Sequence, residues 1–89
     1  MEKKILMSEI QNFIWKTEKI FDKDPFRITN LENLNLYNNY VKKMKELFPD
    51  QRELQELTEI DPKKQEISND ELYILAGRLD CFIYLLKED

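Results

Sequence analysis

The chain has 89 residues, of which 42% are hydrophobic and 36% are charged, and its formal net charge is -4. This composition is typical of a folded globular protein, and the length predicts a single helical domain over residues 1–89. The acidic balance argues against nucleic acid as a partner, because phosphate-backbone binding depends on clustered lysine and arginine. The apolar runs are too short for a membrane span or a signal peptide, so we expect a cytoplasmic protein without membrane contact.

Turn-forming residues are scarce, and their scarcity favours an all-α fold. One glycine and three prolines are too few for the hairpin turns of a many-stranded protein. Apolar residues instead recur at spacings of three and four, which is the period of one helix face. The sequence predicts a small bundle of three long helices plus one short helix, at about residues 5–22, 30–48, 51–60 and 69–87.

The first helix has an apolar stripe that stops before Pro25, a residue that the α-helix does not tolerate well. The stripe consists of Leu6, Ile10, Phe13, Ile14, Thr17, Ile20 and Phe21. Ser8 with Gln11 fits a capping box at the helix start, whereas the apolar Ile5 fits an extension of the helix upstream. The pattern is compatible with both starts.

The second and third helices are each followed closely by a proline. Thr29 with Glu32 fits the capping-box pattern and directly precedes the apolar stripe of residues 30–48. Leucine and isoleucine at helical spacing predict the short helix at 51–60.

The last helix, residues 69–87, begins at a capping box formed by Ser68 and Glu71 and carries more apolar surface than one core face needs. Its predicted core stripe consists of Leu72, Leu75, Ala76, Leu79, Phe82, Ile83 and Leu86. A second apolar stripe consists of Ile74, Cys81 and Leu85. A helix that is apolar on two faces is either central in its own bundle or shared with another chain. Because four helices barely enclose a centre, we favour a homodimer or a groove for a partner protein.

Gly77 and Cys81 lie within this predicted helix. A mid-helix glycine costs about 1 kcal/mol relative to alanine, so Gly77 either marks the close approach of a neighbouring helix or is tolerated without a role. Cys81 is the only cysteine, so no disulfide can form within the chain. Its apolar neighbours Phe82 and Ile83 predict a buried thiol in a reducing compartment.

The chain contains no histidine. Histidine supplies most general-base catalysis near neutral pH and is the commonest metal ligand. Catalytic triads and zinc sites are therefore not expected, and Ser8 and Ser68 fit helix caps better than nucleophiles. We expect a protein that is not an enzyme and that holds no metal or cofactor.

The segment Glu53-Leu54-Gln55-Glu56 resembles the first half of the E-x-x-E and E-x-x-D signature of the all-α nucleoside-triphosphate pyrophosphohydrolases. That resemblance implies magnesium held by helix carboxylates. The second half of the signature is missing, because Glu66-Ile67-Ser68-Asn69 ends in asparagine. We therefore interpret the acidic residues of the third helix as a solvated face.

The segment Leu75-Ala76-Gly77-Arg78-Leu79-Asp80 is similar to the L-S-Q-E-L-D motif of the small helical aspartyl-phosphate phosphatases that act on sporulation response regulators. Leu75, Leu79 and Asp80 match, whereas Gly77-Arg78 replaces the Gln-Glu pair that defines the site of that family. The similarity keeps one alternative open, which is a small oligomeric regulator that binds or dephosphorylates a phosphorylated ligand or response regulator.

On the last helix, Tyr73, Gly77, Asp80 and Tyr84 align at i, i+4, i+7 and i+11. Under the alternative function, Tyr73, Arg78, Asp80 and Tyr84 would bind the ligand. The interpretation that we favour for Asp80 is structural pairing, with water, with Lys42 or Lys43 of the second helix, or with Arg78 of a neighbouring chain.

Trp15 projects from the side of the first helix opposite its core stripe. An exposed tryptophan is a candidate hot spot for protein binding, although the turn at residues 24–26 or another helix could cover it. Its neighbours on the helix surface are the polar residues Gln11, Glu18, Lys19 and Asp22.

The leading hypothesis is a non-catalytic small helical protein that binds a partner protein. Proteins of this kind include inhibitors, immunity proteins, antitoxins and phage-encoded or plasmid-encoded anti-defence proteins. Such proteins cover a partner with a few hot spots inside a polar rim. The predicted contact residues are Trp15, Lys19, Ile74, Gly77, Cys81 and Leu85.

Overall fold

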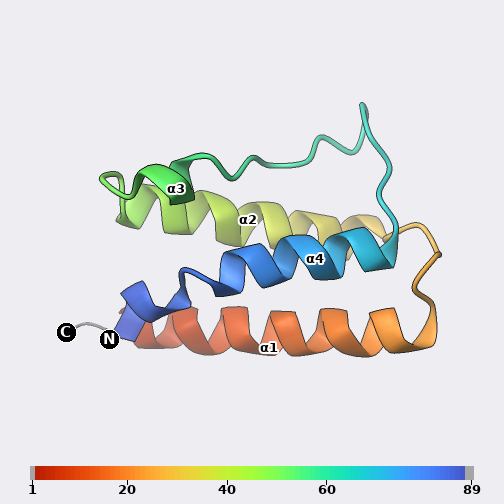
Figure 1. The fold of residues 1–89 in the computed structure, drawn as a ribbon, viewed down its shortest axis with the longest axis horizontal. Helices are drawn as coiled ribbons and strands as arrows, with labels where there is room; N and C mark the ends of the chain where they lie inside the picture. Colours follow the sequence, from red (N-terminus) through yellow and green to blue (C-terminus); the bar gives the residue numbers. More distant parts are fainter. Residues whose placement is uncertain (1, 88–89) are drawn as a thin grey trace.

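Three long helices lie alongside one another in a computed structural model that describes residues 2–87 (Figure 1). The elements are α1 (Glu2–Lys23), α2 (Leu31–Leu47), the short α3 (Arg52–Gln55), α4 (Asn69–Asp80) and the 3-10 helix η1 (Ile83–Lys87). This arrangement confirms the predicted all-α bundle of three long helices and one short helix. The molecule measures about 38 × 25 × 18 Å.

The core lies where α1, α2 and α4 face one another. α1 packs most closely against α4 and η1, and the backbones of α1 and α2 approach each other less. Each large aliphatic side chain buried here contributes about 1.5–3 kcal/mol to the free energy of unfolding. The apolar side chains removed most completely from solvent are those of Ile10, Tyr37, Val41, Met44, Leu54, Leu72, Ala76, Leu79 and Leu86.

α1 begins at Glu2, so the upstream extension is the correct start and Ser8 is an interior residue of the helix. Its buried face contains Leu6, Ile10, Phe13 and Thr17, as the stripe predicts. The buried Thr17 hydroxyl donates a 2.6 Å hydrogen bond to the Ile14 carbonyl oxygen. A polar side chain can therefore occupy this core position without an unsatisfied donor.

The residue that caps α2 is Asn30, and the prediction of Thr29 as the cap is wrong. Asn30 Oδ1 accepts a 2.8 Å hydrogen bond from the backbone N–H of Asn33. The Thr29 hydroxyl instead donates to Asn69 Oδ1 at 3.0 Å, in a buried contact with the start of α4. The two segments also pair through a backbone bridge between Ile28 and Ser68. The Thr29 hydroxyl thus forms a tertiary contact and is not the helix cap that the local pattern predicted.

The short helix α3 has four residues and does not reach residue 60 as predicted. Side chains of α2 hold the following segment extended. Asn38 Nδ2 donates to the Ile60 carbonyl oxygen at 2.8 Å and Asn38 Oδ1 accepts from the Ile60 N–H at 2.7 Å. Lys45 Nζ donates to the Leu57 carbonyl oxygen at 2.7 Å. These bonds satisfy backbone groups outside a helix, and the segment runs back along α2 (Figure 1).

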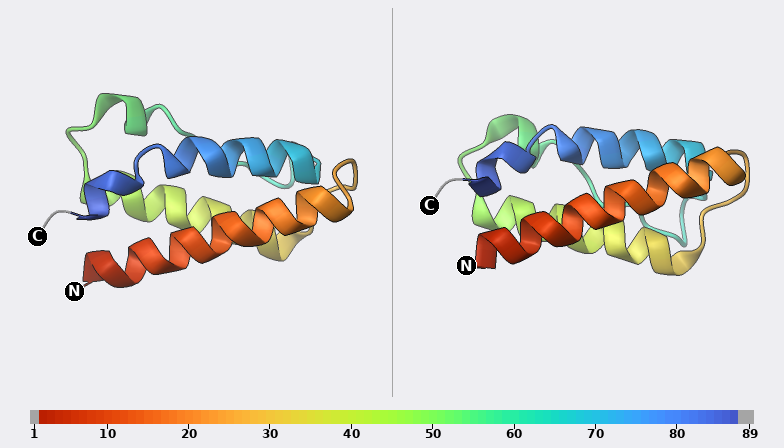
Figure 2. Two further views of the ribbon diagram at one scale, coloured as in Figure 1. Left: turned by 60° about the horizontal axis from the view of Figure 1, so that its bottom comes forward. Right: turned by 90° about the horizontal axis from the view of Figure 1, so that it is seen from below.

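The last predicted helix, 69–87, is wrong in its second half. It begins as predicted at the Ser68 capping box, in which the Ser68 N–H donates to the Glu71 carboxylate at 3.0 Å. The α-helix ends at Asp80, and Phe82 N–H then donates to the Leu79 carbonyl oxygen at 3.0 Å. Such i to i+3 bonds tighten the chain into a 3-10 helix. Figure 2 shows that the chain bends here and that η1 lies over the first turns of α1.

Candidate functional site

Trp15 is exposed on α1, as its position opposite the core stripe predicts. The side chain is 59% exposed, and neither the turn at residues 24–26 nor another helix covers it within the described chain. Lys19, one turn further along α1, places its ammonium nitrogen 4.0 Å from the centroid of the indole ring. This cation–π contact leaves most of the Trp15 side chain exposed to solvent.

Ile74 and Gly77 lie on the outward face of α4, and Cys81 directly follows its last residue; all three are exposed. The prediction that Cys81 is buried is wrong, because Cys81 comes two residues after the buried Leu79 and so lies about 200° from it around the helix. Leu85 was predicted on the same face and is instead a core residue with 6% of its surface exposed. The turn into η1 rotates Leu85 inward, so in this fold it is not available to a partner.

Gly77 is not a point of close helix approach within the described chain. A Cβ atom built at this position meets no heavy atom within 4 Å outside the helix itself and its chain neighbours. Of the two interpretations, the structure favours the one in which Gly77 is tolerated without a packing role. Any neighbour that requires a glycine here would have to come from another molecule.

The four candidate ligand residues of α4 and η1 do not form one site. Arg78 and Asp80 are two residues apart, which places them about 200° apart around the helix. Tyr84 belongs to η1, beyond the bend. Tyr73 is already engaged, because its hydroxyl donates a 3.2 Å hydrogen bond to Glu18 of α1.

Tyr73 also stacks on Phe21, with ring centroids 4.9 Å apart. The negative charge of Glu18 raises the pKa of the Tyr73 hydroxyl, and partial burial and the hydrogen bond to Glu18 add to the rise. A phenol with a raised pKa stays protonated and cannot act as a base near neutral pH. Tyr73 therefore joins α4 to α1 and is a structural residue.

The predicted pairing of Asp80 with a lysine of α2 is absent. Within residues 2–87, the ion pair that is present joins Arg27 to Asp24 at 3.7 Å. Asp80 is exposed and forms no ion pair with Lys42 or Lys43. Pairing with Arg78 of a second chain stays a prediction.

Among residues 2–87, the acidic side chains do not gather into a metal site. In the part of the chain that the structure describes, no three acidic or cysteine side chains lie close enough to hold one ion. Glu53 and Glu56 are exposed at α3, in agreement with a solvated acidic face. Within residues 2–87, no helix combines the length and apolar character that a bilayer crossing requires.

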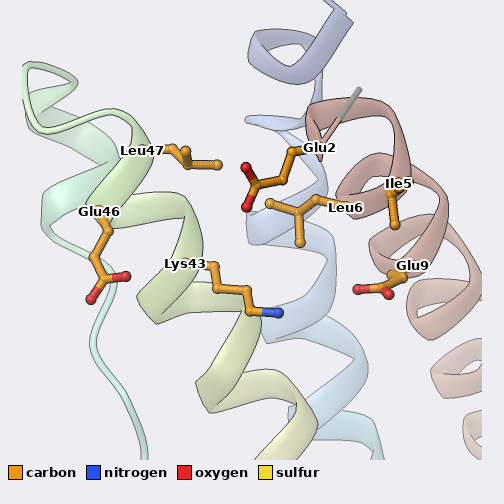
Figure 3. Close-up of a pocket in the computed structure, with 7 residues that line it drawn as sticks. All are labelled: Glu2, Ile5, Leu6, Glu9, Lys43, Glu46 and Leu47. Carbon is orange, nitrogen blue, oxygen red and sulfur yellow. The ribbon is translucent and has the colours of Figure 1, made fainter.

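A groove between the start of α1 and the end of α2 is the feature that sequence reasoning missed. We call it the α1–α2 groove, and its volume is about 350 Å³ (Figure 3). It combines exposed aliphatic side chains with three carboxylates and one amine. The lining residues are Glu2, Ile5, Leu6, Glu9, Lys43, Glu46 and Leu47. Ile5 and Leu47 are apolar residues that lie beside the core stripes of their helices. Their position outside the stripes was the only indication of the groove in the sequence.

A second apolar surface, also missed, lies at the opposite end of the bundle. Phe26 is 85% exposed, and Ile28 and Leu31 are more than half exposed. Ile28 and Leu31 line a hollow of about 390 Å³ together with residues of the 62–67 loop. Nothing in this sequence pattern distinguished the surface from an ordinary turn.

Comparison of the chain with known protein families, with curated proteins and with solved structures found no match.

Proposed function

We propose that this protein is a non-catalytic helical module that binds a partner protein, and that Trp15 is its main contact. The observation that carries the proposal is the exposure of Trp15 on a regular helix. Tryptophan is enriched among residues that dominate binding energy, because its large ring excludes water from the contact. Polar neighbours such as Gln11 and Glu18 suit the rim of such a contact.

The kind of partner follows from size and chemistry. A chain of 89 residues without histidine suits a protein that blocks or covers another, such as an inhibitor, immunity protein, antitoxin or anti-defence protein of a phage or plasmid. We also propose that the protein acts in the cytoplasm and that it forms a homodimer. Exposed Ile74 and Cys81 on α4 would provide the second contact surface.

The test is affinity capture from the native host with the wild-type chain, Trp15→Ala and Phe26→Ala. Phe26 is the matched control, because it is an exposed aromatic residue that lies beyond the end of α1, in the turn at residues 24–26. A hot spot is worth about 2 kcal/mol or more, so Trp15→Ala should weaken partner binding by about 30-fold or more, with Phe26→Ala close to wild type. Equal binding by wild type and Trp15→Ala would refute the role of Trp15. Light scattering measures the homodimer in the same samples.

A phosphorylated ligand remains the alternative. Its weakness is the separation of Arg78 from Asp80 around α4. Thermal shift with acetyl phosphate or nucleotides tests it, because a ligand that binds the native state raises the melting temperature.

A further inference from the structure

The α1–α2 groove exposes apolar side chains that the fold itself does not cover. Ile5 is 63% exposed and Leu47 is 41% exposed, and the two come from opposite walls. In Figure 3, Leu47 reaches from α2 toward α1, above the ammonium group of Lys43. Apolar side chains that a fold leaves uncovered and that charged residues surround are found at contact surfaces.

The groove is also acidic. Its walls carry Glu2, Glu9 and Glu46 against the single amine of Lys43. In Figure 3 the carboxylates of Glu2 and Glu9 are turned toward the space between the helices, and that of Glu46 points away from α1. None of the three carboxylates forms an ion pair within residues 2–87. A partner that brings positive charge would therefore meet unpaired carboxylates.

The groove continues along the seam between α1 and α2. A second hollow of about 470 Å³ shares Glu9 and Lys43 with the first and extends to Lys16 on α1 and Leu36 on α2. From Glu2 to Lys16 the seam runs along fourteen residues of α1, which corresponds to a length of about 21 Å along the helix axis. The backbones of α1 and α2 are less closely packed than those of α1 and α4. The length fits a helix of about fourteen residues.

We propose that the α1–α2 groove binds a basic amphipathic helix of a partner protein. An aliphatic side chain of that helix lies between Ile5 and Leu47, its lysine or arginine residues face Glu2 and Glu9, and Glu46 adds negative charge at the outer side of the α2 wall. Helix-in-groove binding of this kind combines apolar anchors on one helix face with charges beside them. The inference rests on the proposed partner-binding function and names the chemistry of the partner at a second surface, separate from Trp15.

The test uses a defined probe, a synthetic fourteen-residue helix of leucine and lysine with leucine at spacings of three and four. Binding to the full chain is followed by fluorescence anisotropy, and the contact is mapped by amide chemical shifts in nuclear magnetic resonance. We expect shifts within residues 2–16 and 36–47. A second peptide with glutamate in place of every lysine should not bind.

Two triple variants remove equal charge at different places. The groove variant is Glu2→Gln, Glu9→Gln and Glu46→Gln, and the control variant is Glu32→Gln, Glu53→Gln and Glu56→Gln, all exposed positions. The groove variant should weaken binding about 10-fold or more at low salt, while the control variant changes it about 2-fold or less. Ile5→Ser with Leu47→Ser should also weaken it about 10-fold or more.

Equal losses in the two triple variants would overturn the proposal, because they would indicate attraction by net charge alone. Binding of the glutamate peptide, shifts confined to α4, or no binding of the lysine peptide would overturn it too. Trp15→Ala should leave peptide binding unchanged. If the peptide fails while capture through Trp15 succeeds, only the groove assignment is wrong. If capture fails while the groove binds the peptide, only the role of Trp15 is wrong.

Discussion

The hydroxyl of Thr29 donates a buried 3.0 Å hydrogen bond to Oδ1 of Asn69, forty residues further along the chain. The same amide donates through Nδ2 to the Asp24 carbonyl oxygen at 2.9 Å. The backbone N–H of Asn69 also donates to the Arg27 carbonyl oxygen at 2.8 Å. One side chain and one peptide group thus attach the loop between α1 and α2 to the start of α4.

Replacement of Asn69 should lower the free energy of unfolding strongly, because its buried side chain forms two hydrogen bonds. Asn69→Ala removes both side-chain bonds and leaves the buried Thr29 hydroxyl without its acceptor. We expect a loss of about 2–3 kcal/mol in the free energy of unfolding, measured by urea titration. Asn12→Ala, at an exposed position of α1, is the control and should change stability by less than about 0.5 kcal/mol. A similar effect of the two variants would contradict the role of this contact.

Two aromatic residues of α1 should differ sharply in their effect on stability. Trp15→Ala removes an exposed ring and should change the free energy of unfolding by about 0.5 kcal/mol or less. Phe13→Ala empties a core position and should cost about 3–5 kcal/mol. Thermal unfolding followed by circular dichroism measures both. A large loss in Trp15→Ala would show that the indole is covered in solution.

Gly77→Ala should stabilise the isolated chain. The position is helical, exposed and free of neighbours, so the new methyl group meets no clash while the unfolded chain loses conformational freedom. The expected gain is about 0.5–1 kcal/mol in urea titration. A loss of stability would mean that another molecule packs closely on Gly77, and light scattering of the wild type and the variant would then differ.

Cys81 should react as a surface thiol. Its exposure predicts that the native protein reacts with a disulfide reagent such as Ellman's reagent within about 10-fold of the rate in denaturant. Cys81→Ser should change the free energy of unfolding by about 0.5 kcal/mol or less. Strong protection of the thiol in the native state would indicate that a second chain covers this face of α4.

Three tyrosines should lose their protons at higher pH than free tyrosine, because the pKa of each is raised in the folded protein. Burial raises the pKa of the Tyr37 hydroxyl above its ordinary value of 10.0, although the charge of Arg78 partly opposes the rise. Burial and then the charge of Glu9 raise the pKa of Tyr40, and the charge of Glu18 raises that of Tyr73. A raised pKa in the folded state means that the unfolded chain loses these protons first.

The contribution of these tyrosines to the free energy of unfolding is therefore fully present below about pH 10. It is lost as the pH rises through the folded-state pKa values. Absorbance of tyrosinate against pH, combined with unfolding at each pH, measures both effects. Tyr37→Phe should make this alkaline decline smaller. A decline that begins well below pH 10 would have another cause.

Local patterns predicted the parts of the fold that depend on one segment. The spacing of Leu6, Ile10 and Phe13 gave the correct face of α1, and Ser68 with Glu71 gave the correct start of α4. The same kind of pattern failed at Thr29, because the hydroxyl found a partner in a distant part of the chain. It failed at Leu57 and Ile60 for the same reason, since α2 side chains bind the backbone there.

The surfaces depend on how whole helices pack, which spacing alone does not reveal. The exposure of Trp15 was predictable, because α1 has one clear apolar stripe and Trp15 lies opposite it. Leu85 was misplaced because the change from α-helix to 3-10 helix alters the angle per residue after Asp80. The α1–α2 groove was missed because it depends on the separation of two helices, which no single stripe encodes.

The position of η1 over the first turns of α1 has a consequence for synthesis. α1 leaves the ribosome first, but most of the packing that covers its apolar stripe comes from α4 and η1 at residues 69–87. Until those residues emerge, Leu6, Ile10 and Phe13 lack most of their native cover, although Tyr40 of α2 already packs against Phe13. The native core of this bundle therefore cannot close before residues 69–87 are made, and a chain shortened before them would leave α1 without its main packing partners.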